Sequence, residues 1–135
     1  MKEEYNVKCV IHEKEINGII QTYERKEDVE IILKVENIVI TEQADNFFDA
    51  LIKIRKELEN KEMKLLCKGC CKNVYPSGML LGMGSGRKAY FLTINRQAEM
   101  SSLVDIFEAC SIEEYASVEE QENFFNKWCD SIGEL

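Results

Sequence analysis

Apolar and polar residues alternate in the segment that runs from residue 29 to residue 40. Every second residue is apolar from Val29 to Val35, and the alternation resumes on the opposite phase at Ile38 and Ile40. Alternation with a period of two is typical of a strand with one buried face. A bulge or tight turn at residues 36–37 explains the change of phase, because a slip of one residue moves side chains to the other face.

The preceding segment contains the dipeptide Asn17-Gly18 between apolar residues. Both residue types tolerate the positive φ angles of a type I′ turn, and Asn-Gly is a strong hairpin signal. We therefore predict an N-terminal hairpin with strands at roughly 5–16 and 19–25. This prediction places His12, the only histidine of the sequence, within the first strand.

Residues 45–60 carry apolar side chains at helical spacing. The stripe has steps of four, three and four residues: Phe47, Leu51, Ile54 and Leu58. Such a stripe forms one face of an amphipathic helix. Asp45 or Asn46 fits the N-cap, because a short side-chain oxygen accepts from the free amides of the first turn.

Residues 117–133 predict a second amphipathic helix. Ser117 and Glu120 are spaced as a capping box, and Gly133 fits the residue that ends the helix. The apolar face of this helix comprises Phe125, Trp128, Cys129 and Ile132.

Shorter patterns fill the rest of the chain. Residues 61–67 and 88–95 read as strands, whereas residues 101–109 fit either a strand or a short helix. The stretch of roughly twenty residues between the two strands has no periodicity, and loops of that length are usually functional or mobile. We expect Leu80 and Leu81 within it to be buried, because exposed apolar runs are a liability. The patterns together predict an α+β fold: one domain over residues 1–135, with a mostly antiparallel sheet, an N-terminal hairpin and two main amphipathic helices.

Charge is distributed unevenly along this chain of net charge −8. Residues 61–97 hold seven basic residues against Glu62 alone, net +6, whereas residues 98–135 hold Lys127 against ten acids, net −9. A sequence pI of 4.8 disfavours binding to nucleic acid, whose phosphates an acidic surface repels. No window approaches the ~18–20 apolar residues of a membrane span, and no secretory signal is present at the start. We expect a cytoplasmic protein that does not bind membranes.

Three of the six cysteines form the motif C-x-x-C-C at Cys67, Cys70 and Cys71. A structural zinc site takes four ligands, usually from two separate knuckles, and no second knuckle is present. A thioredoxin-like redox pair lacks the strand-to-helix context that lowers a thiol pKa. In a reducing compartment, buried thiols behave as small apolar side chains. We predict no metal site and no cofactor.

The glycine-rich segment from Gly82 to Lys88 resembles a phosphate loop only superficially. In a P-loop the lysine follows the glycine directly and a hydroxyl comes next, but here Arg87 follows Gly86 and Ala89 follows Lys88. Glycine amides flanked by Arg87 and Lys88 still suit an anion nest. The alternative is a turn whose glycines supply positive φ angles, and this is the interpretation we favour.

The residues from Asn73 to Met79, N-V-Y-P-S-G-M, and from Gly86 to Tyr90, G-R-K-A-Y, carry a resemblance. Together with V-D-I-F at residues 104–107 and the last helix, they resemble a family of small bacterial proteins that are often associated with polymorphic toxin systems. The resemblance covers about residues 62–130. It implies an immunity-protein-like role and assigns no catalytic residue.

We hypothesise a non-catalytic module that binds another protein, most simply an immunity protein that neutralises a basic toxin such as a nuclease. An acidic protein is steered to a basic cleft and occludes it without chemistry. The alternative is an anion- or nucleotide-binding protein or an enzyme that uses the basic loop 68–88. Six residues are the candidates for partner or ligand binding in either case: Tyr75, Ser77, Met79, Met83, Arg87 and Lys88.

Overall fold

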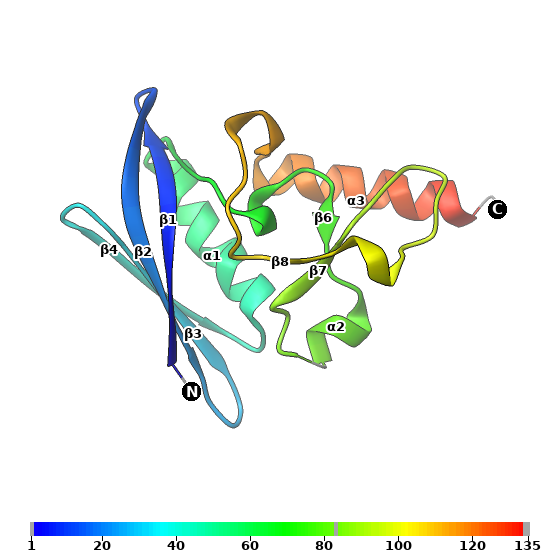
Figure 1. Ribbon diagram of the computed structural model, residues 1–135, viewed down its shortest axis with the longest axis horizontal. Coiled ribbons are helices and arrows are strands. Elements are labelled where there is room, and N and C mark those ends of the chain that lie inside the picture. Colours follow the sequence, from blue (N-terminus) through cyan, green and yellow to red (C-terminus); the bar gives the residue numbers. More distant parts are fainter. Residues whose placement is uncertain (1, 83, 134–135) are drawn as a thin grey trace.

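The computed structural model describes residues 2–82 and 84–133. A five-stranded sheet with the order β4-β3-β2-β1-β5 forms one side of the molecule (Figure 1). All of its neighbouring strands pair antiparallel. The strands are β1 (Lys2–Ile11), β2 (Lys14–Glu24), β3 (Val29–Val35), β4 (Ile38–Ala44) and β5 (Met63–Leu65).

A three-stranded antiparallel sheet with the order β6-β7-β8 forms the other side. Its strands are β6 (Val74–Tyr75), β7 (Lys88–Phe91) and β8 (Leu103–Asp105). Helix α1 (Phe47–Asn60) packs on β3, β4 and β5 and also contacts α3 (Val118–Gly133). The remaining elements are short: α2 (Gly78–Gly82) and the 3₁₀ turns η1 (Lys68–Cys70), η2 (Met100–Ser102) and η3 (Ile112–Glu114). The predicted α+β class with mostly antiparallel sheet is confirmed.

The N-terminal hairpin is present, but its predicted turn is wrong. β1 and β2 pair from Lys2↔Tyr23 to Ile11↔Lys14, so that the turn lies at His12 and Glu13. Both turn residues have positive φ angles, 49° and 66°. His12 is therefore an exposed turn residue and not a residue of the strand.

Gly18 lies inside β2, where close packing and not a turn requires a glycine. A Cβ atom at this position would lie 2.7 Å from Cγ2 of Val35. The Asn-Gly signal was misleading because the sequence does not distinguish a glycine needed for a turn from one needed for a close contact.

The next strand pair follows its prediction. β3 and β4 are joined by a tight turn at residues 36–37, with Glu36 at a φ angle of 54°. The inward side chains of β3, including Ile31 and Leu33, are fully buried. They belong to an apolar core that also contains Ala89 of β7 and Ile106, which directly follows β8.

Helix α1 also follows its prediction. The side chain of Asn46 accepts a hydrogen bond from the Asp49 amide at 2.8 Å, which makes Asn46 the N-cap. The apolar stripe of α1 is buried, and one charged residue, Arg55, is buried beside it.

Helix α3 has its predicted capping box. The Ser117 amide donates to the Glu120 carboxylate at 2.9 Å, and the Glu120 amide donates to the Ser117 hydroxyl at 3.1 Å. The predicted apolar face, however, is not packed into the core. Cys129 is exposed, the aromatic residues of α3 are half-buried, and Gln121 is its buried residue.

The unpatterned stretch after Cys67 is not a simple loop, because η1, β6 and α2 all lie within it. The expected full burial of Leu80 and Leu81 is wrong, since both are only half-buried on the single turn of α2, but Leu81 does pack against the core. In the ambiguous segment after residue 100, η2 is followed directly by β8. None of the helices in residues 2–82 and 84–133 has the length and apolar character needed to cross a membrane.

Candidate functional site

An apolar pocket of about 200 Å³ lies where β6, β7 and α3 meet. Aromatic rings make most of its wall, because β6 ends at Tyr75, β7 contributes Tyr90, and α3 turns its half-buried face toward them. The lining residues are Tyr75, Pro76, Ser77, Tyr90, Leu92, Ala98, Phe125 and Trp128. Two of the six sequence candidates, Tyr75 and Ser77, thus meet in one pocket.

The rings of the pocket wall hold one another in place. The rings of Tyr75 and Phe125 stack with their centroids 3.9 Å apart and an interplanar angle of 13°. Trp128 continues the stack beyond Phe125, with a centroid separation of 6.0 Å. On its other side Tyr75 meets the edge of the buried ring of Phe48 at 5.0 Å. Because Phe48 belongs to α1, these contacts tie the pocket wall to the core.

Three of the polar groups around the pocket already have partners. The indole nitrogen of Trp128 donates to the carbonyl oxygen of Arg96 at 2.8 Å, and the hydroxyl of Ser77 accepts from the Leu80 amide at 3.2 Å. The Tyr90 hydroxyl contacts the Met100 sulfur at 3.9 Å. The interior of the pocket therefore favours an apolar group.

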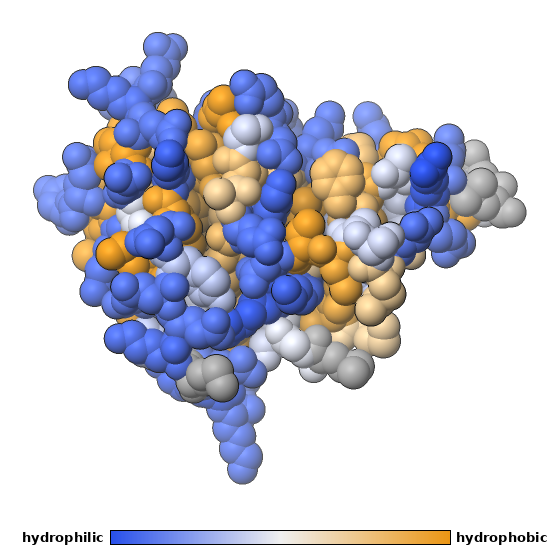
Figure 2. Space-filling view, viewed as in Figure 1, coloured by the Kyte–Doolittle hydropathy of each residue, from blue (hydrophilic) through white to orange (hydrophobic). Residues whose placement is uncertain are grey.

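Apolar side chains are also exposed near the pocket. Met100, beside Tyr90, is 72% exposed. Met79, a sequence candidate, is 62% exposed on α2. In Figure 2 apolar residues gather over β6, β7 and α2, right of centre. Exposed apolar patches of this kind mark interaction sites in soluble proteins.

Negative charges lie close to the aromatic wall. Burial raises the pKa of Tyr75 above its ordinary value, and the charges of Glu122 and Asp49 raise it further. The surroundings of the pocket therefore favour a cationic neighbour over an anionic one.

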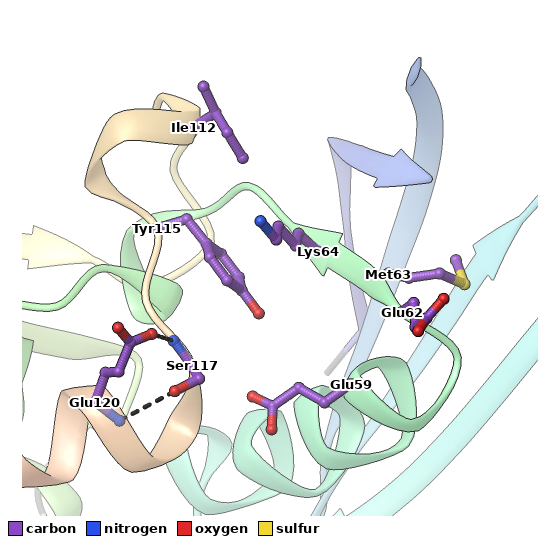
Figure 3. A pocket seen from close by; sticks show the side chains of 8 residues that line it. All are labelled: Glu59, Glu62, Met63, Lys64, Ile112, Tyr115, Ser117 and Glu120. Carbon is purple, nitrogen blue, oxygen red and sulfur yellow. Dashed lines mark hydrogen bonds between the residues drawn. The ribbon is translucent and has the colours of Figure 1, made fainter. Parts of the chain in front are cut away.

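A wider groove of about 710 Å³ lies at the N-terminal end of α3 (Figure 3). Its walls come from the end of α1, from β5 and from η3. The hydroxyl end of Tyr115 points into this groove toward Glu59 (Figure 3), and Lys64 Nζ lies 5.5 Å from the centroid of the Tyr115 ring. Burial raises the pKa of Tyr115 to about 12.

Two carboxylates of the groove accept hydrogen bonds from backbone amides at the start of α3. Glu59 accepts a hydrogen bond from the Val118 amide at 2.9 Å, and Glu120 belongs to the capping box. Both satisfy amides that the first turn of a helix leaves without partners. These contacts give two of the groove's three acidic residues, Glu59 and Glu120, a role as helix caps.

The glycine-rich segment caps α1. The carbonyl oxygen of Ser85 accepts from the Phe47 amide at 2.7 Å, and Gly84 and Gly86 have positive φ angles of 92° and 75°. The Gly86 amide donates to the Leu80 carbonyl oxygen at 3.1 Å. This amide is therefore engaged inside the protein, as in the turn that we favoured over an anion nest.

Arg87 is engaged inside the protein as well. Its guanidinium forms an ion pair with Glu3, donates to the Tyr5 hydroxyl at 2.9 Å and lies 3.8 Å from Glu24. The guanidinium carbon lies 4.6 Å from the centroid of the Phe47 ring.

The other described candidates, Met79, Arg87 and Lys88, do not line the pocket. Lys88 is exposed on β7, and Met83 lies outside the described residues. Of the five candidates that the structure describes, only Tyr75 and Ser77 line the pocket.

Sequence reasoning missed Phe125 and Trp128 as pocket residues, because their spacing on α3 is the same as that of a helix face buried in the core. It also missed Arg55 and Gln121. A signal was present for Arg55, which follows Leu51 by four residues and therefore lies in phase with the apolar stripe of α1.

The sequence matches no protein-family model and no curated protein. The resemblance to toxin-associated bacterial proteins therefore stays a prediction.

Proposed function

We propose that this protein is a non-catalytic protein-binding module, namely an immunity protein that binds and neutralises a toxin with a basic surface. The observation that carries the proposal is the aromatic pocket between β6, β7 and α3, which has exposed apolar side chains beside it. Binding energy in protein interfaces concentrates where a few large side chains fill well-packed pockets.

The size of the pocket favours a protein partner. Sites for small molecules commonly measure about 300–1,000 Å³, whereas this pocket measures about 200 Å³. It has room for one large side chain that a partner inserts. The exposed Met100, which contacts the Tyr90 hydroxyl, then provides further apolar contact around that anchor.

The charge of the protein supports a basic partner. Residues 98–135, which include α3, carry Lys127 against ten acids. Opposite charges on two partners accelerate their encounter and fix its orientation.

The described residues also favour binding over catalysis. His12 lies on the exposed hairpin turn, and the hydroxyl of Ser77 already accepts a backbone hydrogen bond. In nucleophilic catalysis a hydroxyl or thiol would instead be hydrogen-bonded to a general base.

The proposal is tested by looking for a toxin domain encoded next to the gene, co-expressing the protein with it and measuring the growth of the host. Met100→Glu replaces an exposed apolar side chain beside the pocket with a hydrated carboxylate. It is expected to abolish the rescue of growth, because the apolar contact is lost and the carboxylate has to give up its water next to an apolar pocket. The matched control is Val39→Glu on β4, since Val39 is also an exposed apolar residue, at 61%. This control is expected to keep full rescue.

The same pair of variants is then compared by titration calorimetry with the purified toxin domain. A loss of affinity of at least ~10-fold for Met100→Glu alone supports the pocket surface as the interface. Equal affinities for both variants would place the interface elsewhere. If the protein neither rescues growth nor binds the toxin domain, the immunity role is wrong.

A further inference from the structure

Arg55 is a buried cation whose hydrogen-bond partners are all neutral. Its side chain is 1% exposed, and its guanidinium donates to Gln121 Oε1 at 2.7 Å and to the carbonyl oxygens of Ala116 at 2.9 Å and Gly69 at 3.2 Å. Among the described residues no carboxylate forms a salt bridge with it. A buried charge without an opposite charge is costly, so a nearby group that can become an anion is stabilised in that form.

The thiol of Cys70 is such a group. Gly69, whose carbonyl oxygen binds Arg55, precedes Cys70 in the 3₁₀ turn η1. Burial raises the pKa of Cys70, but a hydrogen bond with the Cys67 thiol and the charge of Arg55 lower it more, so that the net shift is downward. The pKa of Cys67 moves the opposite way, because its hydrogen bond to Cys70 and its burial both favour the protonated thiol.

The two sulfur atoms are already close. Cys67 Sγ lies 3.6 Å from Cys70 Sγ across the turn η1, in which the Cys70 amide donates to the Cys67 carbonyl oxygen at 2.8 Å. A disulfide requires the sulfurs to approach by only a further ~1.5 Å. Side-chain rotation and a small adjustment of the turn supply that movement.

We infer that Cys67 and Cys70 form an oxidisable dithiol, which a small peroxide converts into an intramolecular disulfide. This inference does not depend on the proposed partner. It assigns a role to the C-x-x-C motif, which neither the aromatic pocket nor the groove uses.

The reaction has two steps. The Cys70 thiolate attacks one oxygen of hydrogen peroxide; the O–O bond breaks, the departing hydroxide takes a proton to become water, and Cys70 becomes a sulfenic acid. The Cys67 sulfur then attacks the Cys70 sulfur, the S–O bond breaks, and the Cys67 proton leaves with the hydroxyl group as a second water. The two sulfurs lose two electrons in total, and the peroxide gains them.

Burial restricts the oxidant. Cys67 and Cys70 are both 0% exposed, so a small neutral molecule such as hydrogen peroxide reaches them more readily than a bulky alkylating reagent or a protein thiol does. Cys129 is exposed on α3 and reacts with either class of reagent.

In the test, the folded protein is treated with hydrogen peroxide. The remaining thiols are then blocked under denaturing conditions, and the protein is digested with trypsin. Cleavage after Lys64, Lys68 and Lys72 separates Cys67 on peptide 65–68 from Cys70 on peptide 69–72. The expected product is these two peptides joined by a disulfide that dithiothreitol reverses. The Cys129→Ser background prevents disulfides between molecules through the exposed thiol.

Variants identify the bonded sulfur, because Cys71 shares a peptide with Cys70. The linked peptides are expected to persist in Cys71→Ser and to disappear in Cys70→Ser, whose fold is checked by circular dichroism. A linkage that is lost in Cys71→Ser overturns the inference. The inference is also overturned if Cys67 and Cys70 both remain free for alkylation after peroxide treatment of the Cys129→Ser protein. This second test needs no substitution at Cys67 or Cys70, so it does not depend on the folding of such variants.

Discussion

The rings of Tyr75 and Phe125 stack at 3.9 Å between two parts of the chain that are 50 residues apart, at the end of β6 and in the middle of α3. This contact holds the half-buried face of α3 against the second sheet and completes the wall of the aromatic pocket.

Phe125→Leu is expected to lower the free energy of unfolding by about 0.5–1.5 kcal/mol, because leucine retains most of the apolar volume and loses the ring stacking. Urea denaturation measures the change. Phe91→Leu is the control, since Phe91 is exposed and no aromatic ring of the described residues packs on it. Equal losses for the two variants would show that the stack contributes nothing of its own.

Gln121→Leu is expected to lower the free energy of unfolding by about 3 kcal/mol or more, because several buried polar groups lose their partner at once. The side-chain nitrogen Nε2 of Gln121 lies 2.9 Å from each of the carbonyl oxygens of Gly69, Cys71 and Val74. The side-chain oxygen Oε1 accepts a hydrogen bond from Arg55. The measurement is again urea denaturation. Asn123→Leu, at an exposed position of α3, is expected to change stability by less than about 0.5 kcal/mol. A neutral Gln121→Leu would contradict the role that we give to this network.

Because of Cys9, the free energy of unfolding is expected to fall as the pH rises in the alkaline range. Burial raises its pKa to about 12, whereas a thiol in the unfolded chain ionises at a pKa of about 8.5. Above the unfolded pKa the unfolded chain releases the thiol proton and the folded chain keeps it, so the stability contributed by this group is present below about pH 8.5 and is lost progressively as the pH rises toward 12.

The stability advantage of the natural chain over Cys9→Ala is therefore expected to shrink by about 2 kcal/mol between pH 7 and pH 10, which follows from ~1.4 kcal/mol per pH unit. Urea denaturation at both pH values measures it. Cys129→Ala, which removes an exposed thiol, is expected to show the same stability difference at both values. An advantage of Cys9 that is independent of pH would contradict the raised pKa.

Arg87→Met discriminates between the two roles of the glycine-rich segment. The substitution removes the contacts with Glu3, Tyr5 and the Phe47 ring and is expected to lower the free energy of unfolding by about 1–2 kcal/mol. Lys88→Met, at an exposed position, is the control and is expected to be neutral.

Inorganic phosphate and nucleotides are then added to the natural chain and to both variants in a thermal shift assay. We expect no ligand-dependent rise in Tm, because the guanidinium of Arg87 and the amide of Gly86 are already engaged. A nucleotide-dependent rise that Arg87→Met alone removes would support the anion-binding alternative and contradict our proposal.

The local elements were largely predictable because their signals are local. Alternation from Val29 to Val35 corresponds to β3, and the stripe from Phe47 to Leu58 corresponds to α1, since in both cases one face is buried against the core. The hairpin turn was misplaced because Gly18 is needed for close packing against Val35, which lies 17 residues away in the sequence, and not for a turn.

The aromatic pocket was predictable only in part. Tyr75 and Ser77 were chosen from their segment, but their partners on α3 lie far along the chain and look like ordinary core positions. Arg87 was a candidate for partner or ligand binding. Its ion pair with Glu3 was not predictable, because the two residues are 84 positions apart and the pairing leaves no trace in the local sequence. Sequence periodicity indicates which face of a helix or strand is apolar, whereas contacts between distant segments depend on the tertiary fold.

Gln121 is the buried residue of α3, and the aromatic side chains of this helix are only half-buried. A helix attached in this way opens as a unit at lower free energy than α1, so its amides are expected to exchange with deuterium earlier than those of α1. Each such opening removes Phe125 and Trp128 from the pocket wall. A partner that fills the pocket binds only the closed state, and its presence would be recorded as slower deuterium exchange along α3.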